Sequence, residues 1–373
     1  MTITLVIRLS SLGDVAILIP TLYSVASKNP DDRFLLITKK SLQPLFFNKP
    51  DNLEVFPMQT KDRHKGLLGL IRAIGDVNQI INQLKSKEKS GIQLKVADLH
   101  SVIRSTIFDF FFKLKGAKIE KIDKDRKAKK ALVREKNKIF VPLKTSFRRY
   151  QEVFERLEYD NLPKSDVGGA YAEREARSNP ETIINLDCFV VPPRNDETLI
   201  GIAPFAKHKG KIYPLDQMEE VARILNDRPA TKIFLFGGKE ESPLLDEWTK
   251  KYEHVESVAG LMPFPDELSL MKSLDVMVSM DSANMHLASL VNTPVVSIWG
   301  ATHPYAGFYG YNQKPENAVQ IDLECRPCSI FGDKTCRRGD YACLKRISPQ
   351  MIADRIFSLL FSFPQTTFEI SQP

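Results

Sequence analysis

The stretch that decides the fold is residues 1–20, which read MTITLVIRLSSLGDVAILIP. Its apolar run predicts a strand over Leu5–Leu9, the serines and glycine that follow predict a tight turn, and Val15–Ala26 has the spacing of a helix. A strand that passes through a short turn directly into a helix is typical of α/β proteins with parallel sheets, in which ligands bind at such turns. The turn lacks the three glycines of a dinucleotide fingerprint, which argues against a simple dehydrogenase.

The same alternation recurs along both halves of the chain. In the first half we predict strands at Leu5–Leu9, Phe34–Ile37, Leu53–Phe56 and Leu94–Ala97, and helices at Val15–Ala26, Leu67–Leu84 and Ile103–Leu114. An irregular stretch over 160–194 then interrupts the pattern. In the second half we predict strands at Leu199–Ala203, Lys232–Phe236, Val276–Ser279 and Val295–Trp299, and helices at Leu215–Leu225, Glu240–Tyr252, His286–Val291 and Pro349–Phe361.

Two similar halves imply two domains, because 373 residues exceed what one hydrophobic core usually organises. We therefore predict an α/β fold with two Rossmann-like domains, whose parallel sheets face each other across an interdomain cleft. Residues 1–185 would form the first domain and residues 186–347 the second. Residues 348–373 would add a C-terminal helix and tail that pack back toward the first domain.

The positive charge of the chain is concentrated in one segment. The net charge is +7, but Lys113–Arg149 alone holds fifteen Lys and Arg against four acids, an excess of +11. Nucleic acid, acidic lipid head groups and a phosphorylated glycolipid all fit such a segment, as does an ordinary solvated surface. No apolar run approaches the ~20 residues that span a bilayer, and the first residues lack the features of a signal peptide. We therefore expect a cytoplasmic protein without a transmembrane segment.

Three segments next to predicted strands carry polar groups. Asp14 follows the first strand, three lysines lie between Lys207 and Lys211, and Asp281-Ser282 precedes the helix that contains His286. Helix starts and lysines favour phosphate groups. The same residues are also common as helix caps, loop lysines and structural histidines. For Asp14 spacing alone favours the helix cap, and for the other two segments it leaves both interpretations open.

Four of the five cysteines are clustered, at Cys325, Cys328, Cys336 and Cys343. In a cytoplasmic chain a structural zinc ion is a sharper explanation than disulfides. The second pair lacks the Cys-x-x-Cys spacing of a zinc ribbon, so reduced, partly buried thiols are the alternative. Cys188 stands apart and is interpreted as a core residue.

Taken together, these segments resemble the heptosyltransferases, which form glycosyltransferase family 9 and have the two-domain GT-B fold. The resemblance runs from Arg8 to the cysteine-rich segment. It rests on the motifs Ser10-Ser11-Leu12-Gly13-Asp14, Asp98-Leu-His100-Ser-Val-Ile-Arg104-Ser105, Lys211-Ile-Tyr213-Pro214, Gly237-Gly238-Lys239-Glu240-Glu241, Asp281-Ser282-Ala283-Asn284-Met285-His286-Leu287 and Trp299-Gly300-Ala301-Thr302-His303-Pro304. Each motif is weak alone, but their order and spacing together are specific.

The resemblance implies a role for each matched residue. Asp14 corresponds to the catalytic base. Residues implied to bind the acceptor are Ser11, Gly13, Asp98, His100 and Arg104. Residues implied to bind the donor are Lys211 at its phosphates, Glu241 at its ribose, Met262 at adenine, Asp281 at its sugar, Ser282 at a phosphate, and Ala283 and His286 beside them. Ala283 replaces the family's usual glycine, which would restrict the approach of the backbone to the phosphate.

The implied activity is an inverting transfer of a heptose-type sugar from an ADP-activated donor to a lipopolysaccharide-core acceptor, either lipid A/Kdo or heptose. The resemblance implies no metal and no cofactor, and its partners are a nucleotide sugar and an anionic glycolipid at the inner face of the inner membrane. A sugar-nucleotide epimerase of similar architecture and a basic nucleic-acid-binding protein are the alternatives. The second is less favoured, because the chain contains no recognisable nucleic-acid module and its aromatic residues are not interleaved with the lysines.

Overall fold

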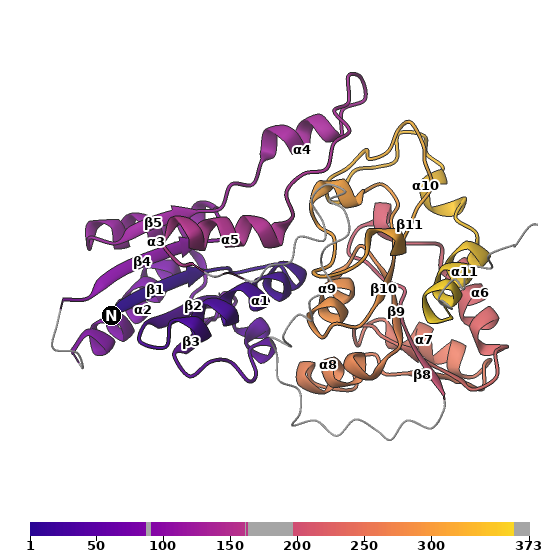
Figure 1. The fold of residues 1–373 in the computed structure, drawn as a ribbon, viewed down its shortest axis with the longest axis horizontal. Helices are drawn as coiled ribbons and strands as arrows, with labels where there is room; N and C mark the ends of the chain where they lie inside the picture. The colour runs from indigo at the N-terminus through magenta and orange to yellow at the C-terminus, as the bar shows by residue number, and fades with distance from the viewer. Residues whose placement is uncertain (87–90, 161, 163–196, 362–373) are drawn as a thin grey trace, which may run out of the picture.

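The computed structural model describes residues 1–86, 91–160, 162 and 197–361. Within these residues the chain forms two α/β domains that lie side by side (Figure 1). The first contains a five-stranded sheet in the order β3-β2-β1-β4-β5, and the second a six-stranded sheet in the order β11-β10-β9-β6-β7-β8. Every strand pair is parallel. The predicted α/β class with two parallel sheets is therefore confirmed.

The first sheet has helices on both faces. Its strands are β1 (Thr2–Ile7), β2 (Arg33–Lys39), β3 (Leu53–Met58), β4 (Gln93–Asp98) and β5 (Lys118–Lys121). One face is covered by α1 (Leu12–Lys28), α5 (Ser146–Arg156) and the short η1 (Lys40–Leu45), and the other by α2 (Gly66–Ser86) and α3 (Ile103–Leu114). Successive residues of β1 enter different cores, with Val6 on the α1 side and Leu5 and Ile7 on the α2 side. Because both faces of the sheet are buried, the sequence of this strand is a nearly continuous run of apolar residues.

The segment between β5 and α5 leaves the first sheet and reaches the second domain; we call residues 122–145 the arm. It carries α4 (Arg126–Leu132) and extends beyond the sheet toward the second domain (Figure 1). The N–H of Leu143 donates to the carbonyl of Tyr305 at 2.9 Å, and Leu132 and Leu143 share a small apolar cluster with Ala306. The basic segment of the sequence therefore joins the two domains.

The second sheet also has two helix layers. Its strands are β6 (Thr198–Ala203), β7 (Thr231–Leu235), β8 (Val255–Ser257), β9 (Val276–Met280), β10 (Val295–Ile298) and β11 (Ala318–Val319). Its helices are α6 (Leu215–Asn226), α7 (Ser242–Thr249), α8 (Phe264–Ser273), α9 (Ala283–Leu290), α10 (Ala342–Lys345) and α11 (Pro349–Leu360), with short turns η2 (Lys209–Lys211), η3 (Pro304–Ala306) and η4 (Pro315–Asn317). Helix α9 packs against α1 of the first domain, so one apolar core continues across both domains.

The C-terminal helix differs from its prediction. Ile352 and Ile356 of α11 enter the core of the second domain, where the helix packs against α6. The expectation that α11 packs back toward the first domain is therefore wrong. An amphipathic pattern shows which side of a helix is apolar, but it does not show which surface that side covers. Residues 362–373, the predicted domain boundary at 185/186 and Cys188 lie outside the described residues.

Most predicted elements are present with shifted ends. β1 ends at Ile7 instead of Leu9, and α9 begins at Ala283 instead of His286. The sequence prediction lacks β5, β8, β11, α4, α5, α8 and α10. The helical spacing of Phe147, Tyr150 and Phe154 was an available signal for α5, whereas prolines at 263 and 265 conceal the start of α8.

Candidate active site

A cavity of about 740 Å³ lies between the two domains. The first domain lines it mainly with the turn that leads into α1, and the second with the loops after β6 and β7, with α8 and with the start of α9. The cavity brings together Asp14, Ser11, Gly13, Lys211, Glu241, Met262, Asp281, Ser282, Ala283 and His286. The structure thus gathers the predicted base, two predicted acceptor residues and all seven predicted donor residues, whose roles in binding stay predictions.

Asp14 is held at the start of α1 by its own turn and by a buried arginine. Arg8 Nη2 lies 2.6 Å from Asp14 Oδ2. The hydroxyl and the backbone N–H of Ser11 donate to the same oxygen at 2.7 and 3.1 Å. A second guanidinium nitrogen of Arg8 donates to the carbonyl of Leu99 at 2.6 Å. Asp14 therefore stabilises the helix start and also lines the cavity, and its role as the base stays a prediction.

The environment of Asp14 keeps it ionised. Burial acts to raise its pKa, but the Arg8 charge and the hydrogen bonds from Ser11 outweigh burial and hold the pKa below its usual value. A quarter of the side chain (25%) is still exposed. An ionised and accessible carboxylate can accept a proton from a bound hydroxyl group. Sequence reasoning did not include Arg8; the available signal was a cation directly after a buried strand.

The two domains approach each other closely at Gly13. A Cβ atom at this position would lie 2.5 Å from Cδ2 of the His286 ring, so only glycine fits without a shift. Burial lowers the pKa of His286 to about 4, which leaves its ring neutral near pH 7. Both residues were predicted as ligand contacts. The structure adds that together they set the spacing between α1 and α9.

The second domain presents an ion pair and a helix start to the cavity. Lys211 Nζ lies 2.8 Å from Asp281 Oδ2, and the two side chains are 14% and 3% exposed. Ser282 is the N-cap of α9, with its hydroxyl 3.2 Å from that of Ser279. The first N–H groups of a helix have no partner within the helix. Next to a lysine they create a positive potential suited to a phosphate group.

Another part of the cavity wall is apolar and carries two carboxyl groups. Met262 and Phe264 supply the apolar surface. Glu241 Oε2 accepts the N–H of Gly238 at 2.7 Å, which fixes the loop after β7. Glu267 of α8 also lines the cavity, and burial raises its pKa to about 7. Phe264 and Glu267 are absent from the sequence prediction because α8 itself is absent from it.

Two predicted acceptor residues, Asp98 and Arg104, do not line the cavity within the described part of the chain. Asp98 is completely buried, and its carboxylate accepts hydrogen bonds from the N–H groups of His100 and Ser101 and from the hydroxyl of Ser105. It therefore positions the turn before α3. Arg104 is exposed on the first turn of α3.

Cations from the arm lie close to Asp14. Lys129 Nζ is 4.3 Å from the ring centre of Phe308, which lines the cavity. Burial, followed by the charge of Arg149, lowers the pKa of Lys129 to about 8. His100, a predicted acceptor residue outside the cavity lining, has its pKa lowered to about 4 by burial and then by the nearby positive charges. Positive charges of the arm and of Arg8 therefore lie on the first-domain side of the site.

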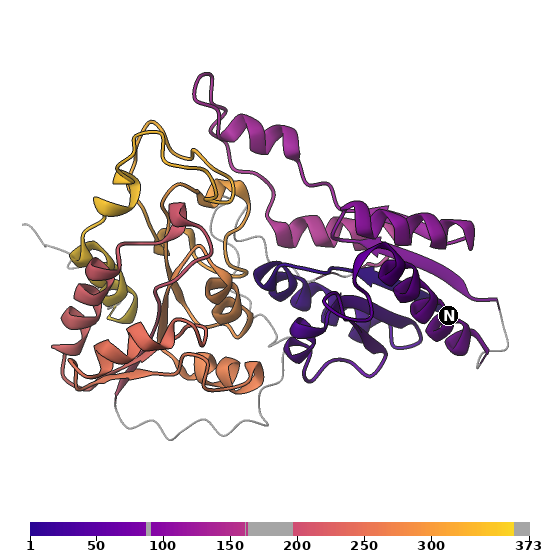
Figure 2. The same ribbon diagram turned by 180° about the vertical axis from the view of Figure 1, so that it is seen from behind.

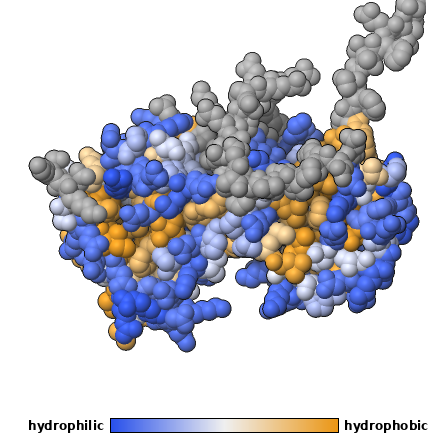
Figure 3. Space-filling model, turned by 90° about the horizontal axis from the view of Figure 1, so that it is seen from below, coloured by the Kyte–Doolittle hydropathy of each residue, from blue (hydrophilic) through white to orange (hydrophobic). Residues whose placement is uncertain are grey.

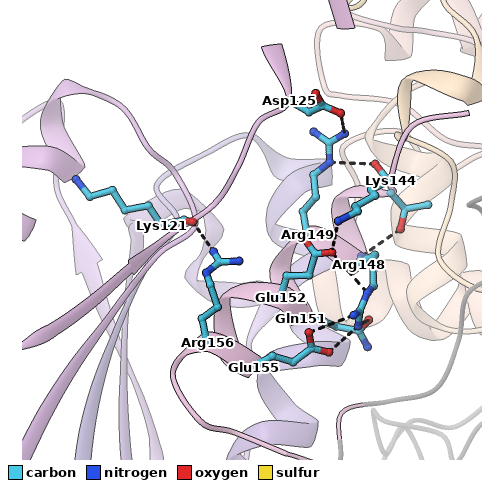
Figure 4. Close-up of polar contacts among 10 residues, drawn as sticks. Lys121, Asp125, Lys144, Arg148, Arg149, Gln151, Glu152, Glu155 and Arg156 are labelled. Atoms are coloured by element: carbon cyan, nitrogen blue, oxygen red, sulfur yellow. Dashed lines mark hydrogen bonds and ion pairs between the residues drawn. The ribbon is translucent and has the colours of Figure 1, made fainter. Parts of the chain in front are cut away.

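Arg149 of α5 is the most buried of these cations. Its side chain is 4% exposed, its Nε donates to the carbonyl of Lys144 at 3.0 Å, and its Nη2 lies 3.6 Å from a carboxylate oxygen of Asp125 (Figure 4). Within the described part of the chain, Nη1 and Nη2 have no hydrogen-bond partner. The neighbouring Arg148 instead forms an ion pair with the partly exposed Glu155 (Figure 4). Arg156 forms one with the partly exposed Glu120. Arg149 therefore links α5 to the arm, and it lies outside the described residues that line the cavity.

The clustered cysteines are free thiols. Burial raises the pKa of Cys328 and raises that of Cys343 to about 11, so both are protonated near neutral pH. Across residues 1–86, 91–160, 162 and 197–361, no group of three or more His, Cys, Asp or Glu is arranged to hold a metal ion. The zinc interpretation therefore has no geometric support in these residues.

Comparisons with known proteins agree with this architecture. A family model described as glycosyltransferase family 9 (heptosyltransferase) matches residues 96–341. The chain is similar to a solved glycosyl transferase family 9 structure from Veillonella parvula DSM 2008, with a TM-score of 0.69, 18% identity, and coverage of 97% of this chain and 98% of the other. No curated protein matches the chain.

Two Escherichia coli structures are also similar. ADP-heptose lipopolysaccharide heptosyltransferase II has a TM-score of 0.62 and 18% identity, with coverage of 97% of this chain and 99% of that one. Heptosyltransferase WaaC with ADP has a TM-score of 0.62 and 17% identity, with coverage of 96% and 100%. Two parallel-sheet domains around one cavity define a GT-B fold. The chain belongs to glycosyltransferase family 9, the heptosyltransferase family, and is a glycosyltransferase rather than an epimerase or a nucleic-acid-binding protein.

Proposed function

We propose that the protein is an inverting heptosyltransferase that moves a heptose-type sugar from an ADP-activated donor to the lipopolysaccharide core. The observation that carries this proposal is the single cavity that Asp14 lines from one domain and Lys211 and Ser282 line from the other. The similar WaaC structures contain ADP and ADP-2-deoxy-2-fluoro heptose. We extend that donor chemistry to this chain.

The second domain would bind the donor. Lys211 and the start of α9 suit the diphosphate, Asp281 suits the sugar hydroxyls, and the apolar wall with Met262 suits a flat base. Negative charge grows on the departing diphosphate as the reaction proceeds. Fixed positive groups that face this charge stabilise the transition state. Because a lysine and a helix start supply that potential, we propose that the reaction needs no metal ion.

The first domain would activate the acceptor. As the acceptor oxygen forms its bond to the anomeric carbon, the bond from that carbon to the diphosphate oxygen breaks and its electron pair leaves with the diphosphate. The hydroxyl proton passes to Asp14, which Arg8 keeps ionised and Ser11 orients. A single displacement from the opposite face of the sugar inverts the anomeric configuration.

The charge near Asp14 favours an anionic acceptor. Lys129 lies against the ring of Phe308 in the cavity wall, and its pKa responds to the charge of Asp14. Phosphate and carboxylate groups are the natural partners of such a cation. The lipid A/Kdo region carries such groups. The protein would meet this glycolipid at the cytoplasmic face of the inner membrane.

A transfer assay tests the donor and the reaction type. The enzyme is incubated with ADP-heptose, UDP-glucose or GDP-mannose, with and without a lipid A/Kdo acceptor, and products are identified by mass spectrometry and NMR. We expect a product of inverted anomeric configuration only when ADP-heptose and acceptor are both present, and an unchanged rate with EDTA. Isomerisation of the donor without acceptor would contradict the proposal.

A matched pair of lysine variants tests the assignment of the diphosphate site. Lys211→Ala removes a cation that lines the cavity, so we expect kcat/KM for the donor to fall roughly 100-fold. Lys209→Ala removes an exposed lysine of the same loop that lies over the Tyr341 ring. We expect this control to stay near wild type. Equal effects of the two substitutions would contradict the assignment.

A further inference from the structure

The first domain has an apolar face that its own fold does not bury. α2 and α3 pack on the same side of the first sheet, in front of it in Figure 2. Their inner sides are already buried, through Leu70 and Ile74 of α2 and Phe108 and Phe112 of α3. Their outer sides carry six large apolar residues with high exposed fractions: Leu67 66%, Leu68 71%, Ile71 56%, Ile103 83%, Phe110 66% and Leu114 74%. We call this set the α2–α3 face.

The spacing on α3 aligns the apolar residues of that helix. Ile103, Ile107, Phe110 and Leu114 follow each other at intervals of one helical turn and form one stripe along the helix. Single exposed apolar residues are normal, whereas a contiguous group marks an interaction surface. Figure 3 shows hydrophobic atoms interleaved with hydrophilic ones on the left lobe, which is the first domain. By contrast, α6 exposes charges such as Arg223 in mutual ion pairs.

The exposed charges on α2 and α3 themselves are cations, whereas the loop before α2 also exposes Asp62. The exposed cations of the α2–α3 face are Arg72, Arg104, Lys113 and Lys115. The single acid of α3, Asp109, is buried and paired with Lys121, and the single acid of α2, Asp76, is paired with Arg63. Apolar side chains bordered by cations, without an unpaired acid on either helix, fit an anionic lipid surface. They do not fit a basic protein or a neutral polar surface.

The position of the face is also suited to a lipid-linked acceptor. α2 follows β3 and α3 follows β4, so both helices begin at the carboxyl edge of the sheet. Asp14 follows β1 at the same edge, because β1 runs parallel to both of its neighbours. Leu67, Leu68 and Ile103, at the first turns of these helices, therefore lie on the side of the domain that holds the catalytic turn.

We propose that the α2–α3 face docks the protein on an anionic lipid bilayer, with the apolar side chains in the interfacial layer and the cations at the lipid phosphates. Binding would be peripheral; in the part of the chain that the structure describes, no helix is long and apolar enough to cross a membrane. The inference goes beyond the proposed function, because docking requires neither donor nor acceptor. Each can therefore fail without the other.

Vesicle co-sedimentation tests the proposal. The full chain is mixed with vesicles of phosphatidylcholine alone, or of equal parts phosphatidylcholine and phosphatidylglycerol, without any nucleotide sugar. We expect binding to the anionic vesicles to be at least ~10-fold stronger and to weaken, without vanishing, at high salt, because only the electrostatic part is screened. Absence of binding to the anionic vesicles would overturn the proposal.

A triple variant tests the surface itself. Ile103→Glu, Phe110→Glu and Leu114→Glu combined change only exposed positions, and we expect binding to fall at least ~10-fold. The control combines Leu244→Glu and Met351→Glu, which are exposed at 41% and 39% on the second domain, and should bind like wild type. Transfer to a short, lipid-free core acceptor should be normal in both variants. Binding of the triple variant equal to wild type would overturn the proposal.

A fluorescent variant separates insertion from other uses of the face. Phe110→Trp places an indole on the stripe, and we expect its emission to shift to the blue when anionic vesicles are added. An unchanged emission would overturn insertion. A dimer in solution that the triple variant dissociates would instead assign the face to a second copy of the chain, and would also overturn the proposal.

Discussion

The two walls of the cavity are built in different ways. The wall proposed for the donor, which we call the donor wall, comes from loops and helix starts of one domain, so that Lys211 and Asp281, from two neighbouring turns, form an ion pair. The wall proposed for the acceptor, the acceptor wall, has one such turn, at Asp14. The cations of the arm and α5 lie outside the described residues that line the cavity, where these segments pack against the second domain.

Under the proposed function, this difference follows from the chemistry that each wall would handle. A diphosphate needs N–H groups and a cation in a compact arrangement, which strand-to-helix turns supply. An anionic glycolipid presents several charges over a larger area, so its cations must come from a segment that extends away from the sheet. Substitutions on each wall should therefore separate donor effects from acceptor effects.

The largest effect is expected at the catalytic turn. Asp14→Asn keeps the size of the side chain but removes the proton acceptor, so we expect transfer to fall roughly 10³-fold. ADP binding, measured by calorimetry, should be nearly unchanged because the donor wall is intact. Since Arg8 loses its carboxylate partner, a melting curve must first show that the variant is folded. Transfer above a few per cent of wild type would show that Asp14 is not the base.

The contact between the walls should give the next largest effect. In Gly13→Ala the new methyl group would lie 2.5 Å from the His286 ring, so we expect a loss of about 1–3 kcal/mol in stability and a lower kcat. His286→Ala in the same chain should recover part of that stability, measured as a double-mutant cycle. Gly75→Ala is the control, because a methyl group there meets nothing within 4 Å. Additive effects at positions 13 and 286 would exclude this contact.

A smaller effect is expected from the arm. Lys129→Met should raise the acceptor KM about 10-fold and leave the donor KM unchanged, because a charge-assisted contact is lost only on the acceptor side. Lys129 has a pKa of about 8, so wild-type acceptor affinity should fall as pH rises through 8, and the variant should lack this dependence. The exposed neighbour Lys130 provides the control as Lys130→Met. An equal rise in the donor KM would mean that this substitution does not separate acceptor binding from donor binding.

The smallest effect concerns the stability of the donor wall. Burial raises the pKa of Glu267 to about 7 from 4.5, so the folded protein holds this proton more tightly than the unfolded chain. Stability from this group is complete below pH 4.5 and is lost as pH rises through 7. Glu267→Gln should therefore be more stable than wild type at pH 8, by on the order of 2 kcal/mol, with little difference at pH 4.5. Urea unfolding at both pH values measures this, and a difference that does not depend on pH would contradict it.

The sheets were the most predictable part of the molecule. Strands such as β1 and β9 are buried on both faces and read as apolar runs, so their presence needs no tertiary information. The arm was not predictable, because its path depends on pairings such as Leu143 with Tyr305, which join distant segments. For the same reason the domain against which α11 packs was predicted wrongly.

In the candidate site, too, features that depend on short motifs could be predicted, and features that depend on contacts between distant segments could not. Asp14, Lys211 and Asp281 follow strands within short motifs, so their grouping in one cavity could be expected from parallel topology. The burial of Asp98 beneath its turn was not visible, because its hydrogen bonds depend on the local backbone path. The close contact of Gly13 with His286 was also hidden, since it joins two domains.

The Lys211–Asp281 ion pair has a consequence for selectivity. Because Asp281 already neutralises the ammonium group, the donor wall offers simple anions little net charge. Free phosphate or pyrophosphate would have to compete with a carboxylate 2.8 Å away. Under the proposed function, a nucleotide sugar brings hydroxyl groups that can satisfy Asp281 and so release Lys211 for the diphosphate. The ion pair would then favour binding of an intact sugar nucleotide. It would weaken binding of the nucleoside diphosphate product once the sugar has been transferred.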